Sequence, residues 1–343
     1  MEKTYYVASW HVGEGEGLTR LVYDKQSNTL ISKNLETTTY RTSYFARDND
    51  ILYVLTEGAK ACPNSSKVTS FHMDSEHLKE ISVSENFASA SPHIMLSHNK
   101  KHLYVSGYLS GCLYSIDTDK YGNLSNTKKV YENFGSGPNV LRQDSSHMHF
   151  SIDTPDFNYI CVCDLGTDEI LVFKTLDNGE VTKIESIKTP AGYGPRHMVF
   201  SKDGKYAYVI CEMTYHLLIF AYEGQGHLEF IKDYDLWPEC PTDKRQCSAI
   251  KLSEDGKTLF TCNRGDGYDA IQAFDITDLE NPALLDCFNK CDFPRDIALL
   301  DDGYIAICNQ HANNIQFIRF NDNKFIQTGI IENILEPVSI IEY

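Results

Sequence analysis

Histidine, arginine and carboxylate residues recur at regular places in this 343-residue chain. Two pairs have the same spacing, because His149 and Asp164 are 15 residues apart and so are His197 and Glu212. Each histidine opens a short apolar run, a tight turn follows, and a second apolar run leads to the acidic residue. If the two runs are paired antiparallel strands, the start of the first strand and the end of the second lie side by side at the same end of the sheet. Imidazoles, guanidinium groups and carboxylates gathered in this way can bind a small anion and transfer protons.

The unit that carries these pairs repeats along the chain. Six copies are visible, and the residues at equivalent places are separated by steps of 50, 54, 50, 52 and 47 residues. The clearest copies have an Asp-Gly pair between the two runs, such as Asp203-Gly204, which is typical of a β-hairpin because glycine accepts a positive φ. A recurrence of this size over this length predicts seven units of a β-propeller. The equivalent residues are Arg47, Ser97, Ser151, Ser201, Ser253 and Leu300.

The seventh unit is divided between the two ends of the chain. Residues 337–343 read as a first strand without a second, and residues 5–10 read as a second strand without a first. Pairing them would close the ring and cover two edge strands that otherwise invite aggregation. We therefore predict an all-β fold, a seven-bladed β-propeller with four-stranded antiparallel blades, formed by residues 1–343 as a single domain.

Composition limits the partners of the protein. The formal net charge is −17 and there is no run of lysines or arginines, which disfavours nucleic acid and anionic membranes as partners. We find no leader segment and no stretch long enough to span a membrane. The sequence leaves the oligomeric state open.

The eleven cysteines lack the spacing of a zinc site, and we expect the cytoplasm as the compartment of the protein. Four of them, at equivalent places in the repeats, are expected to pack in the core, namely Cys163, Cys211, Cys262 and Cys308.

A propeller would bring the polar ends of the strands together near one mouth of its channel. Starts of first strands contribute His93, His147, His149, Arg196, His197 and Arg295. Ends of second strands contribute Glu57, Asp164, Glu212, Asn263, Arg264 and Asn309. We interpret this set as an anion-binding and acid/base site.

Structural roles remain open for several of these residues. Asp164, Asn263 and Asn309 could be turn residues that accept hydrogen bonds from nearby backbone N–H groups. Arg196 and Glu212 could form an ion pair that serves only structure, and His93 could be a satisfied structural histidine. Trp10, Tyr44 and Tyr108, near the expected mouth, suit either a sugar platform or packing.

Metal binding is a separate alternative. The oxygen-rich residues of the set could hold a divalent cation. Arginines in the same ring would compete with that cation for the carboxylates. We therefore expect neither a metal nor another cofactor.

Several motifs make the chain similar to a known family. Segment 192–209 with Cys211-Glu212, segment 146–149 with 164–173, and the pieces 263–265, 294–296 and 309–310 resemble the seven-bladed propeller lactonases. This family includes bacterial 6-phosphogluconolactonase and fungal 3-carboxy-cis,cis-muconate cyclase. The resemblance runs from about residue 4 to residue 343. It departs from the family at Ser146, where proline is usual, and at Gly107-Tyr108, where Asn-Tyr is common.

The resemblance implies an activity and a set of catalytic residues. The catalytic positions of the muconate-cyclase-like site fall on the His147-x-His149 segment, Arg196, Glu212 and Arg264, and the 15-residue spacing favours His149 of the two histidines. The implied reaction is the metal-independent hydrolysis of a small anionic sugar lactone. The substrate that the resemblance favours is 6-phosphogluconolactone, which is hydrolysed to 6-phosphogluconate in the pentose phosphate pathway. Alternatives are a cyclase that forms a lactone from a carboxylated muconate and a non-enzymatic binding module.

Overall fold

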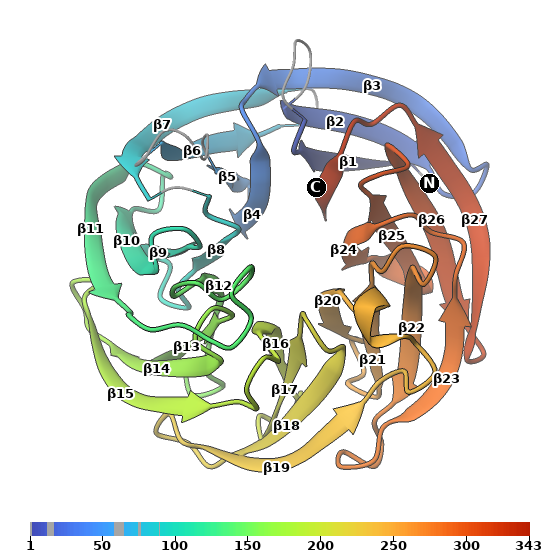
Figure 1. The fold of residues 1–343 in the computed structure, drawn as a ribbon. Coiled ribbons are helices and arrows are strands. Elements are labelled where there is room, and N and C mark those ends of the chain that lie inside the picture. The colour runs from blue at the N-terminus through green and yellow to red at the C-terminus, as the bar shows by residue number, and fades with distance from the viewer. Residues whose placement is uncertain (1, 12–16, 58–64, 75–76, 89) are drawn as a thin grey trace. The chain divides into compact units, whose positions relative to one another are not determined.

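The computed structural model describes residues 2–11, 17–57, 65–74, 77–88 and 90–343. In these residues, 28 β-strands form seven four-stranded antiparallel sheets, as predicted (Figure 1). The chain divides into two compact units. The first comprises Met1–Ser43 with Trp237–Tyr343 and the second comprises Tyr44–Leu236.

The first unit holds three sheets and two short 3-10 helices. One sheet has the order β28 (Pro337–Glu342), β1 (Glu2–Ser9), β2 (Gly17–Asp24) and β3 (Thr29–Thr38). The next consists of β20 (Cys247–Leu252), β21 (Thr258–Asn263), β22 (Ala270–Asp275) and β23 (Ala283–Phe288). The last consists of β24 (Pro294–Leu299), β25 (Tyr304–Asn309), β26 (Asn314–Asn321) and β27 (Lys324–Glu332). The helices are η1 (Thr242–Lys244) and η2 (Asp301–Gly303).

The second unit holds four sheets, of which the first begins two residues before the unit boundary. Their strands follow chain order, starting with β4 (Thr42–Asp48), β5 (Ile51–Thr56), β6 (Ser66–Met73) and β7 (Leu78–Phe87). Next come β8 (His93–Leu96), β9 (His102–Gly107), β10 (Cys112–Thr118) and β11 (Leu124–Glu132). The third sheet has β12 (Met148–Asp153), β13 (Tyr159–Asp164), β14 (Glu169–Thr175) and β15 (Val181–Lys188). The fourth has β16 (Pro195–Phe200), β17 (Tyr206–Cys211), β18 (His216–Tyr222) and β19 (Leu228–Asp235).

The two ends of the chain share one sheet, as the divided repeat predicts. β1 pairs antiparallel with β28, so that Tyr5 lies opposite Glu342 and Ala8 lies opposite Ser339. The backbone N–H of Trp10 extends this pairing with a hydrogen bond to the carbonyl oxygen of Glu336. The first strand of this sheet therefore comes from the end of the chain.

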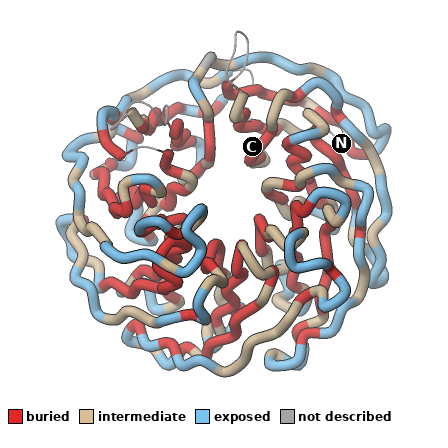
Figure 2. Tube along the Cα trace, viewed as in Figure 1, coloured by how far each residue is buried: buried red, intermediate tan, exposed pale blue. Residues whose placement is uncertain are grey.

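The last strand of each sheet is the least buried of its four strands (Figure 2). In the second unit, β13, β14 and β17 are apolar and nearly all buried, whereas β15 and β19 are largely accessible. Apolar side chains of neighbouring sheets meet between them, as Cys163 and Val172 do with Met198 and Val209. Burial holds the pKa of the Cys163 thiol well above its usual value, so this residue packs as a small apolar side chain.

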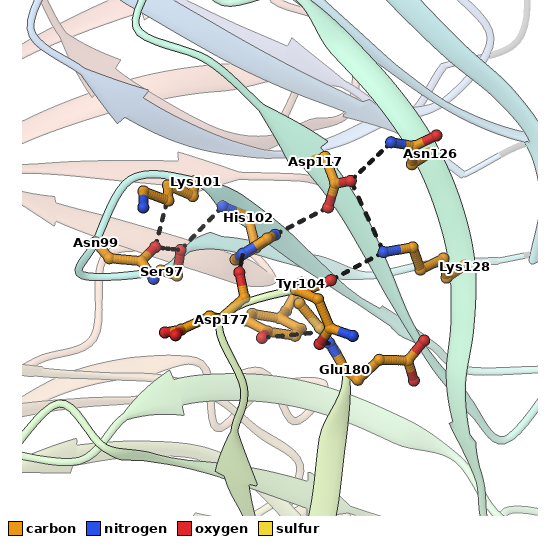
Figure 3. Close-up of polar contacts among 12 residues, drawn as sticks. Ser97, Asn99, Lys101, His102, Tyr104, Asp117, Asn126, Lys128, Asp177 and Glu180 are labelled. Atoms are coloured by element: carbon orange, nitrogen blue, oxygen red, sulfur yellow. Dashed lines mark hydrogen bonds and ion pairs between the residues drawn. The ribbon is translucent and has the colours of Figure 1, made fainter.

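A polar contact joins the β8–β11 sheet to the turn after β14 (Figure 3). Three consecutive carbonyl oxygens of this turn each accept a hydrogen bond from a side chain of the neighbouring sheet. His102 Nε2 donates to Asp177 at 3.1 Å, Lys128 Nζ to Asn178 at 2.8 Å and Tyr104 OH to Gly179 at 3.3 Å. The Asp117 carboxylate lies 3.0 Å from the other ring nitrogen of His102 and orients the ring.

Gly179 is the residue on which this contact depends. Its φ is +78°, and a Cβ atom would lie 2.6 Å from Ser115 Oγ and 2.7 Å from His102 Nδ1. We predict that Gly179→Ala lowers the free energy of unfolding by about 1–3 kcal/mol more than Gly224→Ala, measured by chemical denaturation. Gly224 is a matched control, because its φ is +84° and its Cβ would meet nothing within 4 Å. Equal losses in the two variants would show that the contact adds nothing.

Helices that could cross a membrane do not occur in the described residues, since none is sufficiently long and apolar.

Candidate functional site

Inner strands of the second unit bring several predicted residues together. β12 lies beside β8 and β16. As a result, the His197 ring lies 5.3 Å from that of His149 and 6.3 Å from that of His93, measured between centroids. Phe150 packs against two of these rings, at 4.1 Å from His93 and 4.6 Å from His197. Arg196 precedes His197, and all three histidines are buried.

A carboxylate held by two guanidinium groups lies next to the histidines. Arg196 Nε donates to Glu212 Oε2 at 2.8 Å, and Arg142 Nη2 donates to Glu212 Oε1. Arg196 and Glu212 are buried, whereas Arg142 is partly exposed. The Glu212 charge raises the pKa of Arg142 further above its usual value. An ionised carboxylate needs such partners when buried, because desolvation of an unpaired charge costs several kcal/mol.

Arg142 is a residue that the sequence reasoning missed. It lies in the 15-residue connection between β11 and β12, which has no strand. Gln143, buried next to it, donates from Nε2 to the carbonyl oxygen of Leu165 at 2.8 Å and fixes the connection. A signal was present, since connections of this length without secondary structure are uncommon in compact domains and are often functional.

Three predicted polar residues hold the loops that precede the first strands. Each is the last residue of a second strand, and its side-chain oxygen accepts a hydrogen bond from a backbone N–H 17 residues earlier. The pairs are Asp164 with His147 at 2.7 Å, Asn263 with Gln246 at 2.8 Å and Asn309 with Asp292 at 3.2 Å. The geometry thus favours the turn-residue alternative for all three.

Glu212 occupies a different place, one residue beyond the strand. β17 ends at Cys211, and the Glu212 N–H bonds to the carbonyl oxygen of Gly194, 18 residues earlier. Leu165 and Arg264 make the same 18-residue backbone contact in their sheets. The expected equivalence of Cys211 with Cys163 is therefore wrong by one position. Because of this shift, the Glu212 carboxylate meets the guanidinium groups of Arg196 and Arg142.

Hydrogen bonds define the protonation of two histidines. Arg196 Nη1 lies 2.9 Å from His197 Nε2, and a guanidinium group can only donate, so His197 Nε2 accepts and the ring is neutral. His93 Nδ1 likewise accepts from the Ser151 N–H at 3.3 Å. Both rings therefore use one lone pair to bind neighbouring groups.

His147 is fixed from both sides. Its Nδ1 lies 2.9 Å from the carbonyl oxygen of Tyr108, and its Nε2 lies 3.0 Å from Asp144 Oδ1. The ring stacks on that of Tyr108 at 4.3 Å, with 4° between the planes. The rings of Tyr108 and His149 are nearly perpendicular, with 5.9 Å between their centroids. Of the two histidines in this segment, His149 is the one that faces His197.

Two of the predicted arginines, Arg264 and Arg295, lie in the first unit. Arg264, in the first unit, lies over the ring of Phe293 at 5.2 Å and donates to the carbonyl oxygen of Cys247. It lines a cleft of about 240 Å³ in which burial raises the pKa of Asp269 to about 6. Arg295 lies over the Trp10 ring at 5.0 Å, which favours packing for this tryptophan.

Glu57, in the second unit, is buried, and its backbone oxygen accepts from Ser66 Oγ and from the Ala90 N–H. In the described ranges no group of three or more histidine, cysteine, aspartate or glutamate side chains could hold a metal ion.

Comparison with known proteins supports one family. The family model described as "Lactonase, 7-bladed beta-propeller" matches residues 4–337. A 6-phosphogluconolactonase of Formosa agariphila is 31% identical over 284 residues, which cover 80% of this chain and 78% of that protein. A 6-phosphogluconolactonase of Bacillus subtilis is 25% identical in an alignment that covers 98% of this chain and 95% of that protein. The periplasmic gluconolactonase PpgL of Pseudomonas aeruginosa has the same fold, with a TM-score of 0.91, 24% identity and coverage of 100% and 99%.

The loop-holding role of Asp164 is testable. Replacement by alanine removes an acceptor that serves Ser146, His147 and Asn133 together. Because the buried Ser146 hydroxyl and the His147 N–H would lose this acceptor, we predict that Asp164→Ala lowers the free energy of unfolding by about 2–4 kcal/mol. Asp203→Ala, at an exposed hairpin turn, should cost less than about 1 kcal/mol and is the control. Chemical denaturation of both variants measures the difference, and a similar cost in both would contradict the assignment.

Proposed function

Because the chain belongs to the seven-bladed β-propeller lactonases, we propose that its substrate is a small anionic sugar lactone and, most specifically, 6-phosphogluconolactone. The protein is a lactone-hydrolysing esterase by family. The observation that carries the proposal is the Glu212 carboxylate held between Arg196 and Arg142, with Arg196 bonded to His197 and the His197 ring beside that of His149. Support for the phosphorylated substrate comes from the two relatives named 6-phosphogluconolactonase.

The proposed reaction needs a proton acceptor and a group that stabilises an oxyanion. A water oxygen attacks the lactone carbonyl carbon and gives one proton to a base. The ring C–O bond then breaks, and the ring oxygen takes up a proton and becomes a hydroxyl group. The carbonyl oxygen carries negative charge in between, which a fixed cation in a buried site stabilises strongly.

We assign the proton acceptor to His149. Glu212 is a poor candidate, because both of its oxygens accept hydrogen bonds from guanidinium groups, which stabilise the ionised carboxylate. In this proposal Glu212 aligns the two arginines, and Arg196 stabilises the oxyanion. His197 holds the Arg196 guanidinium in place through its Nε2 lone pair.

Arg196 should tolerate no replacement. We predict that Arg196→Ala lowers kcat/KM for 6-phosphogluconolactone roughly 10²- to 10³-fold. Arg196→Lys should lose nearly as much, because one ammonium group cannot replace the fork that reaches both Glu212 and His197. Initial rates of lactone loss, corrected for spontaneous hydrolysis, measure the effect. Full activity in Arg196→Ala would reject the assignment.

His149 should contribute mainly to the chemical step. We predict that His149→Ala lowers kcat roughly 10²- to 10⁴-fold, as removal of a general base does, with a smaller change in KM. His227→Ala is the control, since His227 is exposed in the same unit and pairs only with Glu185 among the described residues. A rise in KM with unchanged kcat would mean that His149 binds the substrate without accepting the proton.

A further inference from the structure

We propose that Arg142 is the specificity-determining residue of this site and that it binds the negatively charged group of the substrate. The inference rests on the proposed function and deepens it, because it assigns the choice between anionic and neutral lactones to one side chain. It concerns a residue that lies outside the repeated strands.

Arg142 is the accessible cation of the pair that holds Glu212. Its side chain is 35% exposed, whereas the side chains of Arg196 and Glu212 are 3% and 2% exposed. Arg142 uses Nη2 to bond Glu212 Oε1 and Tyr108 OH, the latter at 3.3 Å. Among the described residues, its Nε and Nη1 have no hydrogen-bond acceptor. Three N–H donors of this guanidinium group therefore remain for a ligand.

The surroundings keep these donors in place. Tyr108, which accepts from Arg142, stacks on His147, and His147 is itself held by Asp144. On the backbone side, Gln143 donates its N–H to the carbonyl oxygen of Asn139 at 2.6 Å and accepts from Gly137 at 3.0 Å. A guanidinium group fixed from two directions loses little conformational freedom when it binds an anion.

The local charge suits an anion. Arg142 and Arg196 together carry two positive charges, and Glu212 carries one negative charge, so this cluster has an excess of one positive charge. The whole chain has a formal net charge of −17, which repels anions elsewhere. An accessible excess cation beside the proposed reaction centre is therefore suited to select a phosphate or carboxylate group on the substrate.

The experiment compares two lactones that differ in charge. kcat and KM are measured for 6-phosphogluconolactone and for uncharged gluconolactone with the wild-type protein, Arg142→Gln and Arg142→Lys. For Arg142→Gln we expect kcat/KM on the phosphorylated lactone to fall about 10- to 100-fold, mainly through KM, and on the neutral lactone by a clearly smaller factor. Arg142→Lys should recover part of the preference, because it retains the charge but not the planar donors.

Two further variants distinguish recognition of the substrate charge by Arg142 from a purely structural role of this residue. Lys129→Gln removes the same charge from an exposed position on β11, shortly before the Arg142 connection, and should leave the ratio of the two kcat/KM values unchanged. Tyr108→Phe removes only the hydroxyl that accepts from Arg142 and should lower the ratio in the same direction by a smaller factor. It also keeps the test decisive if Arg142→Gln does not fold.

The outcomes are distinct. If Arg142 only positions Glu212, both lactones lose the same factor, mainly in kcat, and the inference is overturned. A wild-type protein that prefers the neutral lactone overturns it as well, while lactone hydrolysis still stands. A wild-type protein that hydrolyses neither lactone contradicts the proposed function itself, and the inference falls with it.

Discussion

The candidate site depends on compensation of one buried negative charge. Glu212 is almost fully buried, and an ionised carboxylate in such a place needs opposite charges within hydrogen-bonding distance. Arg196 supplies one from the adjacent strand β16, and Arg142 supplies the other from the connection before β12. This requirement fixes the conformation of both arginines, and through Arg196 that of His197. The cluster therefore couples a strand, a strand end and a long connection.

The repeated sheet provides both structural and chemical residues at nearly the same place. A polar residue at the end of the second strand holds the preceding loop in three sheets, through Asp164, Asn263 and Asn309. The next residue along the chain is not needed for this purpose. In the β16–β19 sheet that next residue is Glu212, and in the β20–β23 sheet it is Arg264. A shift of one residue thus separates loop holding from the chemistry that we assign to the site.

The sequence allowed much of the fold to be predicted, because repeated hairpins and an incomplete unit at each end leave a visible pattern. The ion pair of Arg196 with Glu212 also follows from the spacing. The spacing could not separate Glu212 from Asp164, since both lie 15 residues after a histidine and the strand end differs by only one residue. Local irregularities in the pairing of β12 and β16 change the register without a mark in the sequence. Arg142 was missed because its contact with Glu212 spans 70 residues and its connection follows no periodic pattern.

The most direct measurement of the central claim is a crystal structure of the protein with the product, 6-phosphogluconate. We expect the product carboxylate beside Arg196 and His149, where the lactone carbonyl would react, and the phosphate on Nε or Nη1 of Arg142. A product molecule that contacts neither Arg142 nor Arg196 would contradict the account.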